Sequence, residues 1–385
     1  KRLRYPSSFA GGVEAVASTG GQIAPPIMGT AAFVMAELVG VNYWTIAAVA
    51  VLPAFLFYLG VFTTIHLIAK RTGLGAVEQN ELPDWRAALN WRRMSPIIAG
   101  VAGLAFGIMN GNSIQLTACY GMVGIITSYT IATLASGGSM REVVLTLVRA
   151  LDDGGKGVVI VGILLVAAQV FVAIINLTGV GVAVTSSILA LAEGNLIAIA
   201  LIMAVVCLIA GMGLPTSAAY VLVAAVFAPV LIQQGLEPIT VHLFVLYYAV
   251  LSVITPPVCV AVFVAATIAK TSWTGVASQS LRLGVTAYAI PMLMLIYPGL
   301  LLQGGAAAIA MAILAGVGFT LSVAAFFAGQ QIFGRFTFLL WAAPAVLLLF
   351  PYWSATLIGV GLAIVFWIFS TRNSSVTPIA TAQEG

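Results

Sequence analysis

Charged side chains are scarce in this sequence. Only 15 Lys and Arg and 11 Asp and Glu occur among 385 residues, so 7% of the chain is charged, against about 25% in ordinary soluble proteins. Hydrophobic residues reach 62%, whereas soluble domains contain about 45–50%. The charged residues are too few to cover the solvated face of a soluble domain of this length. The net charge of +4 forms no basic stripe, which also excludes nucleic acid as a partner.

Cysteine and histidine are rare as well. The cysteines Cys119, Cys207 and Cys259 each sit inside an apolar run, and no pair has the spacing of a zinc site or a redox motif. A secreted disulfide scaffold is therefore excluded. Two His residues and few carboxylates within the apolar segments provide no constellation for an intramembrane enzyme. We expect no catalytic residue, no metal centre and no cofactor.

Long apolar runs are what the sequence does contain, and they predict a polytopic membrane protein. At about 20 residues per crossing, the runs allow about ten spans of the lipid bilayer. The runs are continuous rather than alternating, which disfavours a β-barrel and predicts an all-α fold. Two stretches with a polar side, residues 140–156 and a shorter one at 271–283, are expected to form amphipathic surface helices.

The positions of Lys and Arg divide the loops into two sets. Every basic cluster can be placed in the cytoplasm, and the opposite loops then contain no Lys or Arg. This partition puts residues 195–213 and 216–233 between two outside loops. They form either two crossings or a re-entrant hairpin with its tip at Pro215, and both readings stay open at this stage.

Two apolar segments resemble each other. The runs GGQIAPPIMG at 20–29 and VLSVITPPVC at 250–259 each carry a Pro-Pro pair with Gly, Ser or Thr shortly before it. Proline lacks an N–H and clashes with the preceding turn, so each pair is expected to break its helix. By the partition above, the two segments run in opposite directions. Paired broken helices in inverted halves are typical of a transporter's midplane site; the alternative is two ordinary proline kinks.

These motifs resemble a known family. The run GVEAVASTGGQIAPPIMG at 12–29 is similar to the large membrane subunit of TRAP transporters, in particular to fused permeases of the TAXI type. GMGLPTSAAY at 211–220 and SVITPP at 252–257 match the second half of the same family. The similarity runs from about residue 4 to residue 303, and nothing is carried over to the region after 304.

The resemblance implies an inverted-repeat, elevator-type transporter with re-entrant hairpins and broken helices. Its function would be secondary active uptake of organic acids, of the dicarboxylate or 2-oxo acid type, coupled to Na⁺ or alternatively to H⁺. A periplasmic TAXI-type solute-binding protein would deliver the substrate, and a small membrane subunit would complete the complex. The location would be the cytoplasmic (inner) membrane of a bacterium or archaeon.

The resemblance also assigns the site. The second hairpin tip would face the break at 252–257, and unwound carbonyls and hydroxyls would supply the oxygen ligands that Na⁺ prefers. The expected ion-binding residues are Ser18, Thr19, Gly213, Thr216, Ser217, Ser252 and Thr255, and the prolines of the breaks and the tip are Pro25, Pro26, Pro215, Pro256 and Pro257. For each hydroxyl alone, a bond to a carbonyl of its own helix is the competing interpretation.

The carboxylate of Glu14 belongs to the expected site, and a basic residue is missing from it. Glu14, near the start of its span, is a candidate proton carrier or ion ligand; the competing interpretation is an interfacial residue at a helix N-terminus. No Arg or Lys within an apolar span is evident as a clamp for a substrate carboxylate.

The expected organisation follows from these motifs. The sequence would comprise the end of a first-repeat hairpin and its broken helix (1–42), scaffold and cytoplasmic connecting helices (43–156), a second repeat (157–303) with hairpin 195–233 and broken helix 239–268, additional membrane helices (304–370) and a polar tail (371–385). In the second repeat, the hairpin tip at Pro215 precedes the break at Pro256 by 41 residues. The same distance before the first break at Pro25 reaches back beyond Lys1. The first hairpin's leading arm and a fused small-subunit portion are therefore expected upstream of this sequence.

Other functions compete with ion-coupled uptake. The chain could instead be a passive channel or a transporter of another solute class. Saturable flux that depends on an ion gradient would distinguish a transporter from a channel.

The partition of basic residues predicts the topology. Single cysteines introduced at Gly194 and Gly235 should react with a membrane-impermeant thiol reagent from the periplasm, and one at Arg149 only from the cytoplasm. Periplasmic labelling at position 149 would overturn the orientation and, with it, the inversion of the two Pro-Pro segments.

Overall fold

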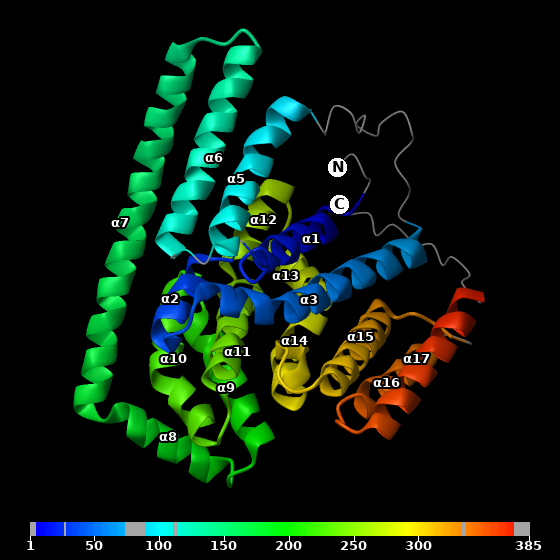
Figure 1. Ribbon diagram of the computed structural model, residues 1–385. Helices are drawn as coiled ribbons and strands as arrows, with labels where there is room; N and C mark the ends of the chain where they lie inside the picture. The colour runs from blue at the N-terminus through cyan, green and yellow to red at the C-terminus, as the bar shows by residue number, and fades with distance from the viewer. Residues whose placement is uncertain are drawn as a thin grey trace. The chain divides into compact units, whose positions relative to one another are not determined.

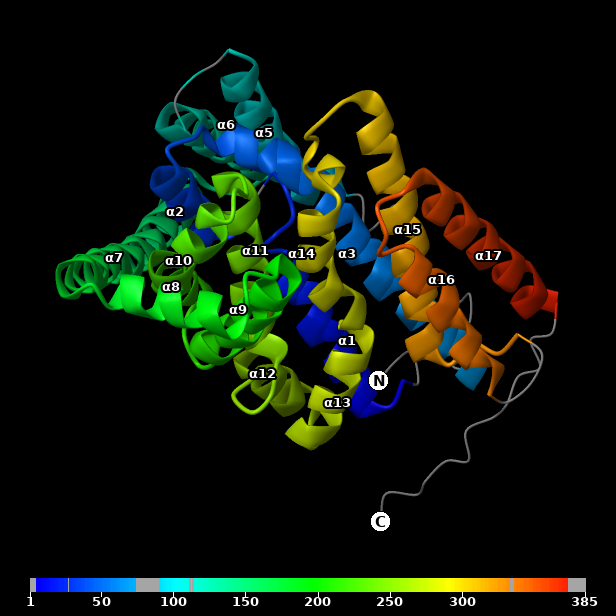
Figure 2. The same cartoon turned by 90° about the horizontal axis from the view of Figure 1, so that it is seen from below.

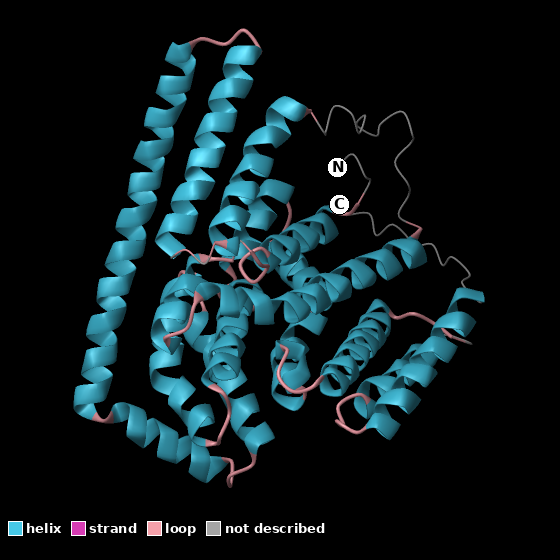
Figure 3. Cartoon of the chain, viewed as in Figure 1, coloured by secondary structure: helices cyan, strands magenta, loops and turns pink. Residues whose placement is uncertain are grey.

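The computed structural model describes residues 5–26, 28–73, 90–110, 112, 114–332 and 336–372. Within these ranges all regular secondary structure is helical, and no strand is present (Figure 3). The predicted all-α fold class is therefore confirmed. The polar tail expected at 371–385 lies almost wholly outside the described residues.

Six helical segments in the described part are long and apolar enough to cross a membrane. They are Tyr43–Thr72, Gln115–Ala135, Thr216–Gln233, Trp273–Ile296, Ala306–Ala328 and Trp353–Thr371. Other apolar helices, such as Thr30–Val39 and Leu196–Gly211, have only 10–17 residues. The sequence estimate of about ten crossings therefore counted several runs that the structure divides into shorter pieces.

The chain splits into two compact units, residues 77–166 and the remainder. In the smaller unit, α5 (Trp91–Met109) and α6 (Ile114–Ala135) pack along their length. Glycines make the close approach possible: a Cβ on Gly103 would overlap the carbonyl oxygen of Tyr120, and one on Gly124 would overlap that of Ala99. Small residues at such crossings are how membrane helices gain contact area.

Helix α7 (Met140–Thr178) corrects the expectation of a separate surface helix at 140–156. It is one helix of 39 residues, with its amphipathic start and its apolar remainder in continuous register. Gly154 and Gly155 lie just before the expected end of that helix at residue 156, but a Gly pair costs only about 1 kcal/mol per residue in a helix. The expected boundary at 156/157 thus falls within α7.

Helix α11 (Pro238–Leu251) is the centre of the larger unit, and every residue from Thr240 to Leu251 is buried. It contacts α2 (Thr30–Val39), α9 (Leu196–Gly211), α10 (Thr216–Gln233) and α14 (Val285–Ile296) (Figures 1 and 2). Tyr220 of α10 shares a buried hydrogen bond of 2.7 Å with His242 Nδ1 of α11. Helix α8 (Val180–Leu191) comes before α9 in the chain and contacts α9 and α10.

Helices α3 (Tyr43–Thr72) and α15 (Ala306–Ala328) pack together (Figure 2). The remaining helices of this unit are α1 (Ser7–Gly20), α12 (Val260–Ala269), α13 (Trp273–Leu283), α16 (Ala342–Leu347), α17 (Trp353–Arg372) and the short 3-10 helices η2 (Ser252–Ile254), η3 (Pro298–Leu301) and η4 (Thr337–Trp341). The expected helix at 271–283 matches α13, which begins at the cap Ser272.

The close packing of α5 and α6 predicts the effect of a single methyl group. Gly103→Ala should destabilise the smaller unit by about 1–3 kcal/mol, because its Cβ would meet backbone atoms that cannot rotate away. Gly155→Ala is the matched control, since nothing lies within 4 Å of its Cβ; it should leave stability unchanged or raised by up to about 1 kcal/mol. Thermal unfolding followed by circular dichroism measures both, and equal transition midpoints would contradict the packing argument.

Candidate functional site

The first break separates α1 from α2. Helix α1 ends at Gly20 and α2 begins at Thr30, with Pro25-Pro26 between them in a cis peptide. The hydroxyl of Tyr43, at the start of α3, donates to the carbonyl of Pro26 at 2.8 Å and accepts from Met28 N at 3.3 Å. Tyr43 is 1% exposed. One side chain thus pairs two backbone groups that the break removes from the helical ladder.

The second break separates α11 from α12. Helix α11 ends at Leu251, the chain makes the 3-10 turn η2, and α12 begins at Val260, after a second cis Pro-Pro pair. Thr255 Oγ1 donates to Leu251 O at 2.7 Å and shares a bond of 2.7 Å with the hydroxyl of Tyr288, from α14. Hydroxyl groups therefore satisfy carbonyls at this break as well.

The turn between α9 and α10 lies against the second break. Gly213 has φ +74°, a conformation that favours glycine, and Pro215 precedes the first residue of α10. A Cβ on Gly211 would lie 2.5 Å from Ser252 Oγ, and one on Gly213 would lie 3.2 Å from Val258. The turn therefore sits beside the middle of the α11–α12 segment, the depth that a re-entrant hairpin would reach. The crossing itself stays a prediction.

The structure thus places the α9–α10 turn, which carries Gly213, against the segment that begins at Ser252, while Ser18 and Thr19 lie on the last turn of α1. Helix α1 also contacts η2 and α12. Val16 of α1 and Ile254 of η2 both lie within 4 Å of the Cβ position of Gly284. The first broken helix therefore packs against the second break.

The expected hydroxyl groups differ in their partners. Thr19 donates to Ala15 O at 2.6 Å, and Ser252 donates to Ala249 O at 2.8 Å, so both follow the competing interpretation of a bond within the helix. Thr216 and Ser217 are half-buried, and their hydroxyls form no hydrogen bond with the described residues. They are the two hydroxyls at the tip that are free to meet a ligand.

Glu14 is exposed on α1, and its carboxylate accepts a hydrogen bond of 2.8 Å from Ser18 Oγ. This bond joins the expected proton carrier to one of the expected ion ligands. Among the described residues no group of three or more His, Cys, Asp or Glu could hold a metal ion.

Sequence reasoning missed the tyrosines. Tyr43 and Tyr288 bind the two breaks from other helices, and Tyr247 of α11 is fully buried with its hydroxyl unpartnered among the described residues. No local pattern marks them, because Tyr43 is 15 and 17 residues from the two groups that it bonds, Tyr288 is 33 residues from Thr255, and Tyr247 lies in an unbroken apolar run. An aromatic residue capable of hydrogen bonding in such a run is the one signal available.

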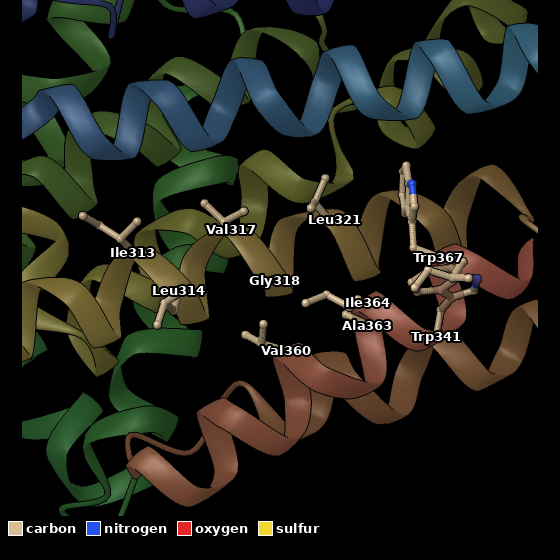
Figure 4. Close-up of a pocket in the computed structure, with 11 residues that line it drawn as sticks. Ile313, Leu314, Val317, Gly318, Leu321, Trp341, Val360, Ala363, Ile364 and Trp367 are labelled. Carbon is tan, nitrogen blue, oxygen red and sulfur yellow. The ribbon is translucent and has the colours of Figure 1, made fainter. Parts of the chain in front are cut away.

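A cavity of about 460 Å³ between α15, η4 and α17 is lined almost entirely by apolar side chains (Figure 4). Val317, Ile364 and Trp367 are among them. The indole N–H of Trp341, which also lines it, donates to Gln330 O at 3.0 Å. A cavity without charged or hydroxyl groups offers nothing that would bind a carboxylate.

Comparisons with known proteins agree on one family. The model of the family described as "Tripartite ATP-independent periplasmic transporter, DctM component" matches residues 1–305. The "C4-dicarboxylate TRAP transporter large permease protein DctM" of Pseudomonas aeruginosa is 24% identical over 267 residues. That similarity covers 68% of this chain and 59% of the relative, so the matched part spans less than two thirds of the relative's length.

The bonds of Tyr43 predict the effect of removing its hydroxyl. Tyr43→Phe should lower stability by about 1–3 kcal/mol, because the buried Met28 N would lose its partner and Pro26 O would lose its donor. Tyr352→Phe is the matched control, since Tyr352 is 66% exposed. Thermal unfolding in detergent measures the difference, and identical midpoints for the two variants would show that the first break does not depend on Tyr43.

Proposed function

This chain belongs to the DctM family of tripartite ATP-independent periplasmic transporters, and from that premise we propose that it carries organic acids into the cell by ion-coupled secondary transport. The observation that carries the proposal is the contact between the α9–α10 turn and the second break. Membership of a transporter family also argues against an enzyme.

The helix ends at this contact support binding of both an ion and an anion. Helices α9 and α11 end there, at Gly211 and Leu251, and present carbonyls with partial negative charge. Helices α10 and α12 begin there, at Thr216 and Val260, and present backbone N–H groups. Carbonyl ends suit a cation and N–H ends suit a carboxylate, the division seen in transporters built from broken helices.

Sodium is the coupling ion that the oxygen-rich tip favours. We assign Gly213, Thr216, Ser217, Ser252 and Thr255 to one ion site, and Ser18 and Thr19 to a second at the first break. A hydroxyl that donates its hydrogen to a carbonyl keeps lone pairs for a cation, so the bonds of Ser252 and Thr255 are compatible with this role. Coupling to protons is the alternative, with Glu14 as the carrier.

The substrate and partners follow from the family. The relative from Pseudomonas aeruginosa is named for C4-dicarboxylates, and a dicarboxylate or 2-oxo acid is our proposed substrate class. A periplasmic solute-binding protein, of the TAXI type suggested by the sequence motifs, would deliver it, together with a small membrane subunit. The proposed location is the cytoplasmic membrane.

The proposed mechanism is alternating access of the elevator type, in which the hairpin and broken helices move as one body. Uptake of labelled succinate and 2-oxoglutarate into proteoliposomes that contain the permease, its small subunit and its binding protein tests this. Saturable uptake that requires a sodium or proton gradient supports it. Flux that rises linearly with concentration and ignores the gradients would indicate a channel instead.

The free hydroxyl of Thr216 predicts a change in sodium dependence. Thr216→Val keeps the shape of the side chain and should raise the sodium concentration for half-maximal uptake by roughly 5- to 150-fold, the loss of one ligand worth about 1–3 kcal/mol. Thr267→Val is the control, because Thr267 is exposed and its hydroxyl bonds only Phe263 O. Overlapping sodium titrations for wild type and Thr216→Val would remove this residue from the site.

A further inference from the structure

A second cavity, of about 720 Å³, lies where α13, α14 and α15 meet the second break. These helices contact one another (Figure 1). Pro256 of the break, Ser278 of α13, Tyr288 of α14 and Phe327 of α15 line the cavity. Among the described residues that line it, Arg282 at the end of α13 is the one that carries a charge. We call it the Arg282 cavity.

The guanidinium of Arg282 is held in place by the end of α15. Its Nε donates to Phe327 O at 2.9 Å and its Nη2 to Ala328 O at 3.4 Å. Arg71 of α3 donates to the same Ala328 O at 2.9 Å. An arginine has five N–H donors, so these bonds fix Arg282 and still leave donors for a ligand.

The two arginines have no counter-ion within the described part of the chain. Its ion pairs there are those of Lys156 with Asp152 and Asp153. The C-terminal end of α15 contributes only about half a negative charge, which two full positive charges exceed. Within the described part of the chain, the two guanidinium groups therefore give this wall an excess of positive charge, which favours an anion.

The rest of the lining defines the shape and chemistry of that anion. The hydroxyl-bearing residues Thr274, Ser278 and Tyr288 and apolar residues such as Leu281 and Val285 also line the cavity. A guanidinium fork matches a carboxylate with two parallel hydrogen bonds. A small organic acid fits this combination, with its carboxylate on Arg282 and its carbon chain on the apolar wall.

The cavity is connected to the proposed ion site. Tyr288 lines it and bonds Thr255, and Pro256 forms part of its wall. A ligand in the cavity would therefore touch the segment whose oxygens we assign to sodium. Arg71 and Arg282 both belong to the basic clusters that the sequence places in the cytoplasm.

From these observations we propose that the Arg282 cavity binds the carboxylate of the transported organic acid at the cytoplasmic side. This inference rests on the proposed function, because it names where that substrate is held before release. The anion of a lipid headgroup is the competing occupant that the experiment excludes.

The test measures protection of a cysteine in the cavity. In a Cys119→Ser background, where Cys207 and Cys259 stay fully buried, Ser278→Cys is labelled with a thiol reagent in detergent. Succinate and 2-oxoglutarate are the probes, with succinamide as the neutral control and short-chain phosphatidylglycerol as the lipid control. Arg282→Gln removes the proposed ligand. Arg71→Gln is the matched control, since Arg71 bonds the same carbonyl but does not line the cavity.

Protection by a carboxylate probe, but not by succinamide, supports the proposal. Arg282→Gln should weaken that protection by about 10-fold or more, as expected for the loss of a charge-assisted hydrogen bond, and Arg71→Gln, which removes a charge but no lining residue, should weaken it clearly less. Absence of protection by both acids, equal loss in both arginine variants, or protection by the lipid alone overturns it.

A second variant separates this inference from the proposed function. Ser278→Phe fills the cavity from an exposed position without removing the charge, and it should abolish uptake of succinate. If both Ser278→Phe and Arg282→Gln take up succinate as fast as the wild type, the proposed role of the cavity is overturned and the proposed transport function stands. Protection without any uptake by the wild type leaves the cavity supported and overturns the proposed function.

Discussion

The structure depends on one constraint, that backbone N–H and C=O groups within a membrane must find partners inside the protein. Each Pro-Pro pair takes groups out of the helical ladder, so each break needs hydrogen-bonding side chains beside it. At the first break Tyr43 supplies them, and at the second Thr255 and Tyr288 do. The hairpin turn and α1 then pack against the second break, where Ser252 and Ile254 are buried while Pro257 and Val258 stay exposed.

The same constraint explains why a hydroxyl at a break can both bond a carbonyl of its own segment and coordinate a cation. Ser252 and Thr255 satisfy carbonyls of their own segment, as an ordinary helix hydroxyl does. That bond uses the hydrogen and leaves the oxygen lone pairs, so it also orients those lone pairs away from the helix. A cation site built on an unwound segment therefore needs the structural bond first. Thr216 and Ser217 differ because they begin α10. The residues four positions before them are not helical, so their carbonyls are not placed to accept from these hydroxyls.

The sequence was sufficient to predict the structure where a residue acts on its own part of the backbone. The Pro-Pro breaks, the turn at Pro215 and the α13 helix were predicted because proline, glycine and the cap Ser272 act on their own backbone. It was insufficient where partners come from elsewhere in the chain. Tyr43 bonds groups of the segment before α2 and Arg282 bonds the end of α15, and no periodicity in the sequence records either contact. The sequence analysis ended the amphipathic helix at residue 156, whereas α7 continues to Thr178, since two glycines weaken a helix without ending it.

The region beyond the family match is part of the same architecture. The match ends at residue 305, and α15 begins at Ala306. Yet α15 packs on α3 and supplies the carbonyls that hold Arg71 and Arg282, as well as Phe327 in the cavity wall. The arginine lies within the matched region, but the position of its guanidinium is set outside it. A relative with the same arginine and a different helix here would orient that charge differently, so the match by itself does not determine how this chain recognises an anion.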